Sequence, residues 1–306
     1  MKLTVCMISY NHEQYIAQAI ESILMQQTNF DFELVIGEDC STDNTRKICF
    51  AYKNKYPDKI RLLLPEKNLG MHRNFFETLQ AARGEYIAFC EGDDYWIDPL
   101  KLQKQVDFLD ANPDCAFCFT NGYKLKHGVI QQETFNQNKK KPPAKFDLEY
   151  YLKQNFPICH NTKVWRKAIT PSTIPDWVYQ VIHLDFVVHI FHAQNGLIGY
   201  LDEITSVYRV HEQGIISSTK RMTILQKGIY TNRHLSEYLG SKYAPLFNDY
   251  TWYFNELSYE SLRQKEMFQF LKYFLKSFAH NPFRKAADYR YYFATLFNIA
   301  ISRSHS

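Results

Sequence analysis

Glu91-Gly92-Asp93-Asp94 places three carboxylates within four positions, directly after an apolar run at 85–90 that is typical of a buried strand. Like charges held this close repel one another unless a positive group lies among them. Divalent cations such as Mg2+ and Mn2+ supply that charge and prefer oxygen ligands. Taken alone, these four residues are more typical of a solvated acidic turn, so the metal hypothesis depends on which other groups reach the same place.

Polar residues also follow the other strands that the sequence predicts. Short apolar runs rich in β-branched residues predict strands at 3–9, 32–37, 60–64 and 85–90, each followed by an amphipathic helix. The residues that follow these strands are Tyr10-Asn11, Glu38-Asp39, Asn68-Leu69-Gly70 and the acidic group Glu91-Gly92-Asp93-Asp94. Alternating strands and helices predict a doubly wound, mainly parallel sheet. Since ligands bind beyond the carboxyl ends of such strands, we expect the four clusters to form one site.

The pattern loosens in the second half of the chain. It predicts helices at 99–112, 147–155 and 183–195, and strands at 115–123, 197–201 and 205–210, with Pro99 in the first turn of its helix. From about residue 219 the chain is helical and markedly aromatic. We therefore expect an α/β domain over residues 1–218 and a helical C-terminal segment over 219–306.

Composition excludes several classes of protein. The net charge of +4, without a dense Lys/Arg tract, argues against nucleic acid as a partner. Met1 leads straight into a predicted strand, so we expect no signal peptide, and no apolar run is long enough to predict a membrane span. Seven scattered cysteines form no disulfide framework, so we expect reduced thiols in a cytoplasmic protein. The turn at 9–13 lacks glycine, which argues against NAD or FAD, and there is no Walker A loop.

The first 125 residues resemble the family 2 glycosyltransferases, enzymes that use nucleotide-sugars and have the GT-A fold. The segments that carry the resemblance, in order, are 7–11, 19–26, 38–43, 68–70, 82–87 and 91–94. It extends more loosely to Asp185 and to 208–211, and ends near Ser218. The membrane spans and the Gln-x-x-Arg-Trp motif of processive members are missing from this sequence, so it is similar to the non-processive, bacterial-type members.

The resemblance implies a divalent metal, Mn2+ or Mg2+, bound at the acidic group. Such a metal neutralises the charge that develops on the departing diphosphate. Asp94 matches the direct metal ligand, and Asp93 matches a ligand of the ribose or of the metal. His211 is similar to a late histidine that some relatives present to the metal or the diphosphate. Glu91 and Glu38 both stand where the family often has aspartate, and both replacements keep the charge. The longer side chain of Glu91 implies that it is a third, outer ligand of the metal.

The resemblance also implies a nucleotide-sugar site. Tyr10 matches a ring that stacks on the base, and Asp39 matches a carboxylate that accepts a hydrogen bond from a pyrimidine N–H, which favours uridine or thymidine. The full set that we expect to bind the nucleotide-sugar is Tyr10, Glu13, Asp39, Asn68, Gly70 and Asp93.

Asp185 resembles the family's catalytic base. In an inverting transferase, one carboxylate takes the proton from the acceptor hydroxyl on the side opposite the leaving group. The alternative is that Asp185 only caps the helix that begins there, as aspartate often does. His189 and His192 lie three apart on the same predicted helix, but no carboxylate or cysteine completes a zinc set nearby, and we expect them to be packed.

The resemblance therefore implies an inverting, metal-dependent hexosyltransferase. It would move one sugar from a UDP- or dTDP-sugar to a glycan or lipid-linked acceptor of a surface polysaccharide, such as capsule or lipopolysaccharide. Residues 1–125 would bind the donor and 126–218 the acceptor. One alternative is a sugar-phosphate nucleotidyltransferase, although the turn at 9–13 is not the glycine-rich basic loop that it needs. The other is an inactive nucleotide-sugar-binding module, which the retained acidic residues argue against.

The C-terminal segment combines aromatic residues with lysines and arginines. Such helices pack on a core or lie on a membrane surface, and packing is the commoner use. Because acceptors of such enzymes are often lipid-linked, we expect peripheral contact with the inner face of the plasma membrane.

Overall fold

The computed structural model describes residues 1–134, 141–154 and 156–280. Their contacts divide the chain into two compact units. The first contains Met1–Pro175 and Leu184–Gly214, and the second contains Asp176–His183 together with the chain from Ile215 onward. The short segment Asp176–His183 therefore packs with the C-terminal helices although it lies within the first 218 residues.

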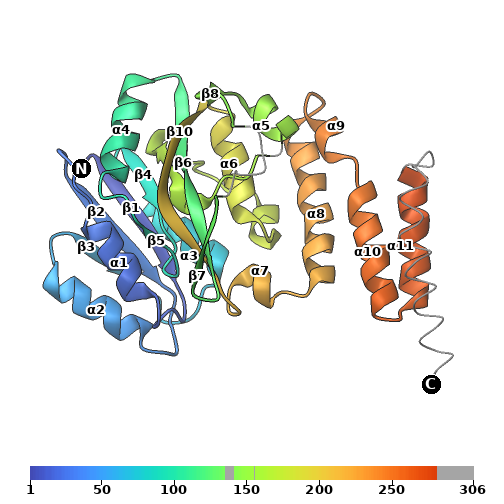
Figure 1. The fold of residues 1–306 in the computed structure, drawn as a ribbon, viewed down its shortest axis with the longest axis horizontal. Coiled ribbons are helices and arrows are strands. Elements are labelled where there is room, and N and C mark those ends of the chain that lie inside the picture. The colour runs from blue at the N-terminus through green and yellow to red at the C-terminus, as the bar shows by residue number, and fades with distance from the viewer. Residues whose placement is uncertain (135–140, 155, 281–306) are drawn as a thin grey trace. The chain divides into compact units, whose positions relative to one another are not determined.

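One half of the sheet in the first unit is parallel (Figure 1). Its strands, in spatial order, are β3 (Ile60–Leu63), β2 (Phe32–Glu38), β1 (Leu3–Ser9) and β4 (Tyr86–Phe89). Every residue of β2 and β4 is buried, because helices cover both faces of the sheet. Strands buried on both faces read as continuous apolar runs, which is why the sequence predicts them well.

The other half of the sheet is mixed. Beyond β4 come β9 (Lys163–Arg166), β6 (Cys115–Lys126), β10 (Leu197–Val210) and β5 (Tyr95–Trp96). β9 runs antiparallel to both of its neighbours, and β10 runs parallel to β6. Two further strands, β7 (Val129–Thr134) and β8 (Lys145–Phe146), pair with β6 and β10. β5, β7, β8 and β9 are too short or too polar to have been predicted from the sequence.

The two closing strands predicted at 197–201 and 205–210 form one strand, so that prediction was wrong. β10 continues through the polar interval and keeps its pairing with β6 through shifts in register, including one between Tyr200 and Ile204. A bulge of this kind adds residues to one strand without ending it. The strand thereby reaches from the start of β6 to the strand ends where the polar clusters lie.

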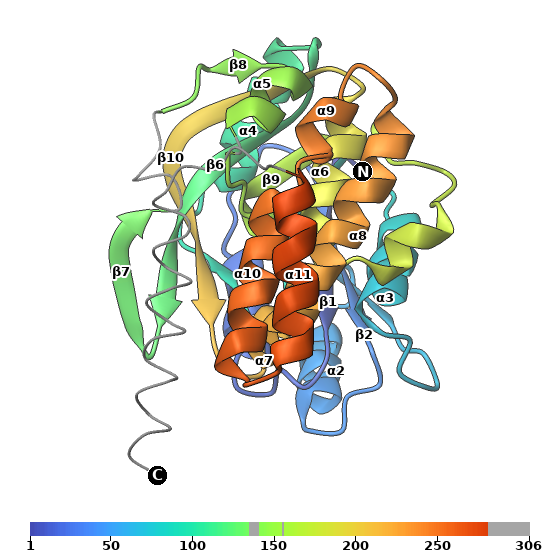
Figure 2. The same ribbon diagram turned by 90° about the vertical axis from the view of Figure 1, so that its right-hand side faces the viewer.

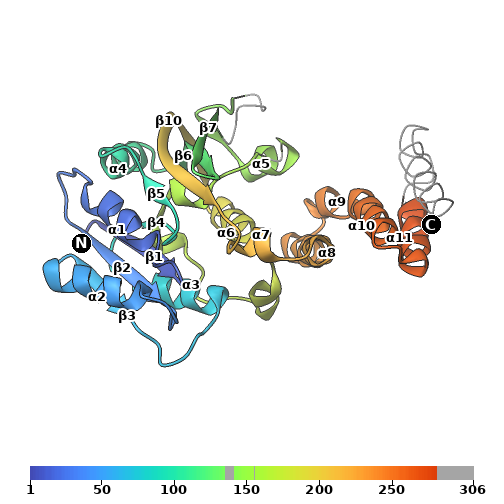
Figure 3. The same ribbon diagram turned by 60° about the horizontal axis from the view of Figure 1, so that its bottom comes forward.

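Helices cover both faces of the sheet (Figure 3). On one face lie α1 (Ile16–Leu24), α2 (Thr45–Lys55) and α4 (Lys101–Ala111), and on the other lie α3 (Met71–Gln80) and α6 (Leu184–Ala193). α5 (Leu148–Gln154) follows β8. The helices predicted for these regions are present, with bounds up to a few residues shorter. Pro99 precedes α4 rather than lying in its first turn, which corrects that placement.

The second unit is helical, as predicted, as far as it is described. It contains α7 (Ile215–Ser218), α8 (Arg221–Leu239), α9 (Ala244–Phe247), α10 (Thr251–Arg263) and α11 (Met267–His280). α10 and α11 run side by side (Figure 2), and the ring of Trp177 stacks on His234 of α8. Among the described helices, none has both the length and the apolar character needed to cross a bilayer. Residues 281–306 of the predicted segment lie outside the described residues.

Candidate active site

The turn after β1 is braced against the loop after β2. Asn11 adopts a positive φ of 56°, a conformation that asparagine tolerates better than most residues. Its side-chain Oδ1 accepts a hydrogen bond from the Thr42 backbone N–H at 2.9 Å, and its own N–H donates to Ser41 Oγ at 2.9 Å. The brace leaves the neighbouring Tyr10 ring 42% exposed at the strand end, where a flat base can stack on it.

Glu13 is directed at the start of α2. Its Oε2 accepts hydrogen bonds from both the backbone N–H and the side-chain amide of Asn44, at 2.9 and 2.8 Å. Its backbone N–H donates to Asp43 Oδ2 at 3.0 Å. A carboxylate is favoured at a helix N-terminus because the amide dipoles there point their positive ends outward. In this structure Glu13 therefore supports the loop, and its contact with a nucleotide remains a prediction.

Asp39 joins two clusters that come from different strand ends. It is buried, and its Oδ1 and Oδ2 accept hydrogen bonds from the backbone N–H groups of Leu69 at 2.7 Å and Gly70 at 2.9 Å. Asn68 Nδ2 donates to the Asp39 backbone carbonyl at 2.9 Å. Gly70 has a φ of 81°, which favours glycine. Each carboxylate oxygen has two lone pairs, so Asp39 can still accept a hydrogen bond from a base.

Glu38 is a structural residue. Its carboxylate is fully buried, pairs with the Arg46 guanidinium and accepts a hydrogen bond from the Ser41 backbone N–H at 2.7 Å. A buried carboxylate needs such partners, because an unpaired charge in the interior is strongly destabilising. The pair fixes the loop that begins at Asp39.

Asp94 faces the interior of the protein and is only 1% exposed. Its Oδ1 accepts a hydrogen bond from the Arg209 backbone N–H at 2.8 Å, and its Oδ2 accepts one from Asn161 Nδ2 at 2.8 Å. Burial, together with the charges of Asp93 and Glu91, raises the pKa of Asp94 well above its usual value. Asp94 thus connects residues 91–94, the acidic loop, to β10 and to the 3-10 turn at His160–Thr162.

Asp93 faces two histidines. Its Oδ2 lies 2.9 Å from His211 Nε2 and 3.8 Å from His12 Nε2. Burial alone would raise the pKa of Asp93, but the hydrogen bond from His211 and the charge of His12 lower it overall, so the carboxylate is ionised at neutral pH. Sequence reasoning identified Asp93 and His211 but missed His12, which stands in the turn after β1 and gave no separate signal.

Glu91 has a buried carboxyl oxygen, Oε2, without a hydrogen-bond partner among the described residues. Burial raises the pKa of Glu91 to about 8, and the charges of Asp93 and Asp185 act in the same direction. Buried polar atoms are nearly always satisfied, so this oxygen has room to accept a hydrogen bond from water or from a ligand group.

The pair of Asp93 and His211 fits a divalent cation. Two ligand atoms about 2.1 Å from a metal and at a right angle to each other lie about 3 Å apart, close to the 2.9 Å between Asp93 Oδ2 and His211 Nε2. Within the described part of the chain, no three His, Cys, Asp or Glu side chains converge on a metal-sized position. Two protein ligands suit an ion that takes its other ligands from phosphate oxygens and water, as Mg2+ commonly does.

Arg209 holds the acidic loop from the side of β10. Its guanidinium lies between two rings, 4.7 Å from the centroid of Tyr15 and 4.9 Å from that of Tyr95. It also donates a hydrogen bond to the backbone carbonyl of Asp93. Sequence reasoning singled out neither Arg209 nor Asn161, both of which contact the acidic residues. Arg209 lay within the resembling stretch 208–211, whereas nothing in the sequence marked Asn161.

A cavity of about 400 Å³ opens beside Arg209 and His211. Its lining includes Arg209 and His211 together with Gln14, Tyr15, Leu125, His127, Gly128, Val210, Glu212 and Gln213. Polar groups, a guanidinium and one aromatic ring line it, which suits a polar ligand such as a diphosphate or a sugar.

Asp185 lies in the first turn of α6 and is half-buried. Its charge contributes to raising the pKa values of Glu91 and of Tyr151, so the carboxylate lies within electrostatic reach of the acidic loop. A carboxylate in a first helical turn is also favoured by the helix dipole, so its position agrees with both a catalytic and a purely structural role.

His189 and His192 are buried, as expected for a packed helix. His189 Nε2 lies 3.2 Å from His160 Nδ1, and His192 Nδ1 lies 2.8 Å from the Lys163 ammonium nitrogen. Burial lowers the pKa of each histidine well below its usual value, so the rings are neutral.

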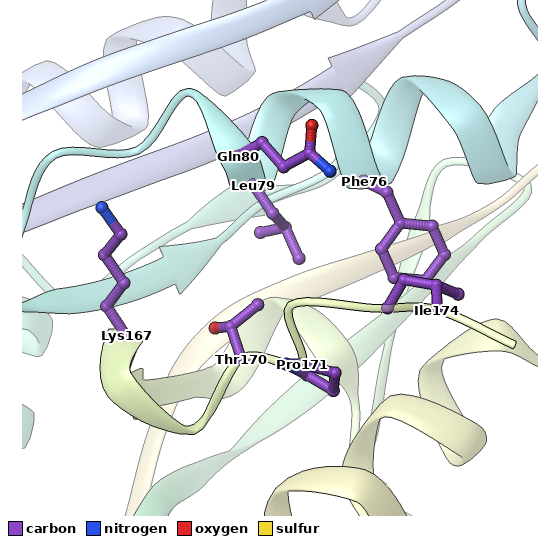
Figure 4. Close-up of a pocket in the computed structure, with 7 residues that line it drawn as sticks. All are labelled: Phe76, Leu79, Gln80, Lys167, Thr170, Pro171 and Ile174. Carbon is purple, nitrogen blue, oxygen red and sulfur yellow. The ribbon is translucent and has the colours of Figure 1, made fainter.

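A second, smaller cavity of about 170 Å³ lies elsewhere (Figure 4). Its lining consists of Phe76, Leu79 and Gln80 from α3, and Lys167, Thr170, Pro171 and Ile174 from the segment after β9. The Lys167 ammonium donates to the backbone carbonyl of Ala82. This cavity contains none of the residues at the strand ends, and its lining includes no carboxylate, imidazole or thiol.

The chain matches a known protein family. The sequence model of glycosyl transferase family 2 covers residues 4–170, which is more than half of the 306 residues. The chain belongs to glycosyl transferase family 2, which confirms the resemblance seen in its motifs.

Relatives support this assignment. The uncharacterized protein Rv1520 of Mycobacterium tuberculosis is 39% identical over 218 residues, which are 70% of this chain and 60% of that protein. The chain thus matches about 60% of the length of this relative. Poly(ribitol-phosphate) beta-N-acetylglucosaminyltransferase TarS of Staphylococcus aureus is 37% identical over 116 residues, 37% of this chain and 19% of TarS.

Solved structures share the fold. TarS residues 1–349 in complex with UDP-GlcNAc align with a TM-score of 0.59 over 88% of this chain and 89% of that chain, at 18% identity. Mannosyltransferase PcManGT from Pyrobaculum calidifontis, in complex with GDP-Man and Mn2+, aligns with a TM-score of 0.58 over 100% of this chain and 81% of that chain, at 14% identity. The predicted GT-A arrangement, a mixed sheet flanked by helices, is confirmed.

Proposed function

We propose that this glycosyltransferase is an inverting, metal-dependent enzyme. It moves one hexose from a uridine or thymidine diphosphate sugar to a hydroxyl of a glycan or lipid-linked saccharide. The observation that carries the proposal is the pair of Asp93 Oδ2 and His211 Nε2, 2.9 Å apart at the end of β4 and beside a polar cavity. The structure of PcManGT contains Mn2+, and that of TarS contains UDP-GlcNAc, which supports the choice of metal and of donor class.

Asp93 and His211 would hold the metal. Mn2+ or Mg2+, when bound, supplies positive charge against the diphosphate of the leaving group. Asp94, which we expected to be the direct ligand, is 1% exposed and faces the Asn161 amide and the Arg209 backbone N–H in the interior. We therefore assign it the role of holding the loop. Glu91, with its unpartnered oxygen, is placed to accept a hydrogen bond from a ribose or sugar hydroxyl.

The donor nucleotide would lie on the parallel half of the sheet. Tyr10 offers an exposed ring for stacking, and Asp39 is held in place by the loop at Asn68 to Gly70. The Asp39 carboxylate can only accept hydrogen bonds when ionised, so it favours a base with an N–H at its edge, such as uracil or thymine. Arg209 would approach the diphosphate from β10.

Asp185 would act as the base. Its carboxylate takes the proton of the acceptor hydroxyl while that oxygen attacks the anomeric carbon and the bond to the nucleoside diphosphate breaks. The supporting observation is that the charge of Asp185 raises the pKa of Glu91, so Asp185 lies near the acidic residues beside which the diphosphate would bind. Half-exposure leaves room for an acceptor to approach.

The proposal also includes the class of acceptor and the location of the enzyme in the cell. The acceptor class that we propose is a surface polysaccharide; TarS, which is named for action on poly(ribitol-phosphate), supports a polymer as the acceptor. We place the enzyme in the cytoplasm, in peripheral contact with the inner face of the plasma membrane through its C-terminal helices.

A thermal-shift panel of nucleotide-sugars, each with and without Mn2+, tests the proposal. We expect a uridine or thymidine diphosphate sugar to raise the melting temperature, and to do so more strongly with Mn2+, because ligands that bind only the folded state stabilise it. Stabilisation by UTP with a sugar phosphate, and not by UDP-sugars, would instead indicate a nucleotidyltransferase. Stabilisation by a sugar nucleotide that is never hydrolysed or transferred would indicate an inactive binding module.

A further inference from the structure

Helix α11 presents an apolar stripe to its surroundings. Phe268, Leu271, Leu275 and Phe278 are 78%, 49%, 62% and 46% exposed. They follow one another at intervals of three, four and three residues, so they lie on one side of the helix. Single exposed apolar residues are common, whereas a contiguous stripe marks an interaction surface.

The opposite side of α11 already provides the packing that holds the helix in its unit. The ring of Tyr273 stacks on that of Phe254 in α10, with centroids 6.5 Å apart and planes at 20°. Phe270 packs in a small cluster with Leu262, and Ser277 Oγ donates to Asn255 Oδ1 at 2.6 Å. The exposed stripe is therefore an addition that the packing of α11 on α10 does not need.

The charges beside the stripe are of one sign. Lys272 and Lys276 are both exposed and lie along one flank of it. The helix contains neither aspartate nor glutamate. The stripe thus offers apolar side chains and ammonium groups together, and a complementary partner must be apolar with negative charge at its boundary.

Two occupants from this chain fit that charge poorly. In a symmetric pair of α11 helices the same patch meets itself, so the lysines would approach each other with no carboxylate on either helix to offset them. The sequence from 281 to 306 carries Arg284, Lys285, Arg290 and Arg303 against a single acid, Asp288, so it adds charge of the same sign.

A lipid surface fits better than an acidic protein. The stripe is the outward face of a helix, and a protein partner would have to provide a groove of matching shape. A bilayer adapts to any shape, because apolar side chains enter the acyl boundary while lysines extend to the headgroup phosphates.

We propose that the α11 stripe, with Lys272 and Lys276, binds the surface of an anionic lipid bilayer. The four apolar side chains insert below the headgroups, and the two ammonium groups pair with headgroup phosphates. This proposal rests on the proposed function, which includes membrane contact: it identifies the helix face and the class of lipid that would make that contact. Binding of vesicles needs neither donor nor acceptor, so it can be measured separately from sugar transfer.

Flotation of the full chain with vesicles tests the proposal. We expect the protein to float with vesicles that contain phosphatidylglycerol, and far less with pure phosphatidylcholine. Phe268→Ser with Leu275→Ser should lower the partition coefficient at least about tenfold, because two large apolar groups leave the membrane. Lys272→Gln with Lys276→Gln should lower it about 25-fold on the anionic vesicles, at roughly a fivefold loss for each lysine.

Phe50→Ser is the matched control, since Phe50 is a 44% exposed aromatic residue on α2 of the other unit. It should leave flotation unchanged, and circular dichroism should show that all variants keep their helices. Unchanged flotation of the Phe268/Leu275 variant, or no flotation of the native chain on anionic vesicles, would overturn the proposal. So would a native dimer, seen by sedimentation, that this variant converts to monomer. UDP binding measured in parallel separates the two claims, because the stripe variants should retain it even if the native chain fails to float.

Discussion

Asp39 at the end of β2 is held by backbone amides that lie 30 and 31 residues further along the chain, whereas Asp93 at the end of β4 meets His211, which lies 118 residues further. The same contrast separates the two halves of the sheet. The parallel half braces its loops with one another, strand end against next strand end. The mixed half brings β10 and the turn before β9 onto the acidic loop.

This difference suggests a division of labour in the proposed mechanism. The parallel half holds Tyr10 and Asp39, which would bind the donor, and the mixed half brings His211 and Arg209 to the groups that would meet the diphosphate. α6, with Asp185, also belongs to the later part of the chain. Changes in the parallel half should then affect the affinity for the donor, and changes in the mixed half should affect turnover and the metal.

The largest expected effect comes from Asp185→Asn. Losing the base should lower kcat by about 10²- to 10⁴-fold, while the dissociation constant of the donor changes little, because Asn keeps the size of the side chain. Steady-state transfer assays and calorimetric titration with UDP measure the two quantities. Asp147→Asn is the control, since Asp147 accepts a hydrogen bond from the Tyr150 N–H at the start of α5 and has no assigned part in chemistry. Equal kcat for native and Asp185→Asn proteins would leave Asp185 a purely structural residue of α6.

Asp94→Ala should mainly lower stability. It leaves the Arg209 backbone N–H and the Asn161 amide without their acceptor in a buried place, which should cost about 2 to 5 kcal/mol in the free energy of unfolding. Urea denaturation of the metal-free protein measures this loss. Asp94→Asn retains one acceptor oxygen and should lose less. An Asp94→Ala protein as stable as the native chain would contradict the role assigned to this carboxylate.

Asp39→Ala should release the loop at Asn68 to Gly70 and weaken binding of the donor. Two backbone N–H groups lose their acceptor, which should cost about 1 to 3 kcal/mol, or about 5- to 150-fold in donor affinity if the loop must be ordered to bind. Titration with UDP measures it. Asn68→Ala removes the side chain's bond to the Asp39 carbonyl and the longer bond that Asn68 Oδ1 accepts from the Gly70 N–H at 3.1 Å. It leaves both bonds to the Asp39 carboxylate in place and should have a smaller effect. A change in kcat without a change in UDP affinity would break the division between the two halves.

The smallest effect that we expect is on the pH dependence of stability. The pKa of Glu91 is about 8 in the folded protein against 4.5 ordinarily, so between these values the folded state binds one proton more than the unfolded state. The free energy of unfolding of the metal-free protein should therefore fall as the pH rises from 7 to 8, by up to about 1.4 kcal/mol. In Glu91→Gln this part of the slope should vanish. Parallel slopes for the two proteins would show that Glu91 is not protonated in the fold.

The parallel half of the fold could be predicted from the sequence because its signals are local. β1 and β2 are continuous apolar runs, each followed by an amphipathic helix, and the residues of their loops contact each other after one strand–helix unit. The family resemblance rested on the same region, and the family model covers it.

The mixed half could not be predicted to the same extent, because its contacts join distant parts of the chain. β9 is a four-residue strand that is recognisable only between its neighbours β4 and β6. Nothing near Asn161 in the sequence shows that its amide meets Asp94, 67 residues earlier. For the same reason the sequence could not show which of two adjacent aspartates turns inward. The resemblance favoured Asp94 for the metal, whereas we propose Asp93.

Binding of Mn2+ in the presence of UDP, measured by calorimetry on the native protein and three variants, tests this central claim most directly. Asp93→Asn and His211→Gln should each weaken Mn2+ binding at least about tenfold, because each loses a direct ligand. Asp94→Asn should bind Mn2+ within about threefold of the native protein, because we assign Asp94 no contact with the metal and asparagine still offers one acceptor oxygen to the fold. Loss of Mn2+ binding in Asp94→Asn, together with native binding in Asp93→Asn, would contradict the assignment of the metal to Asp93 and His211.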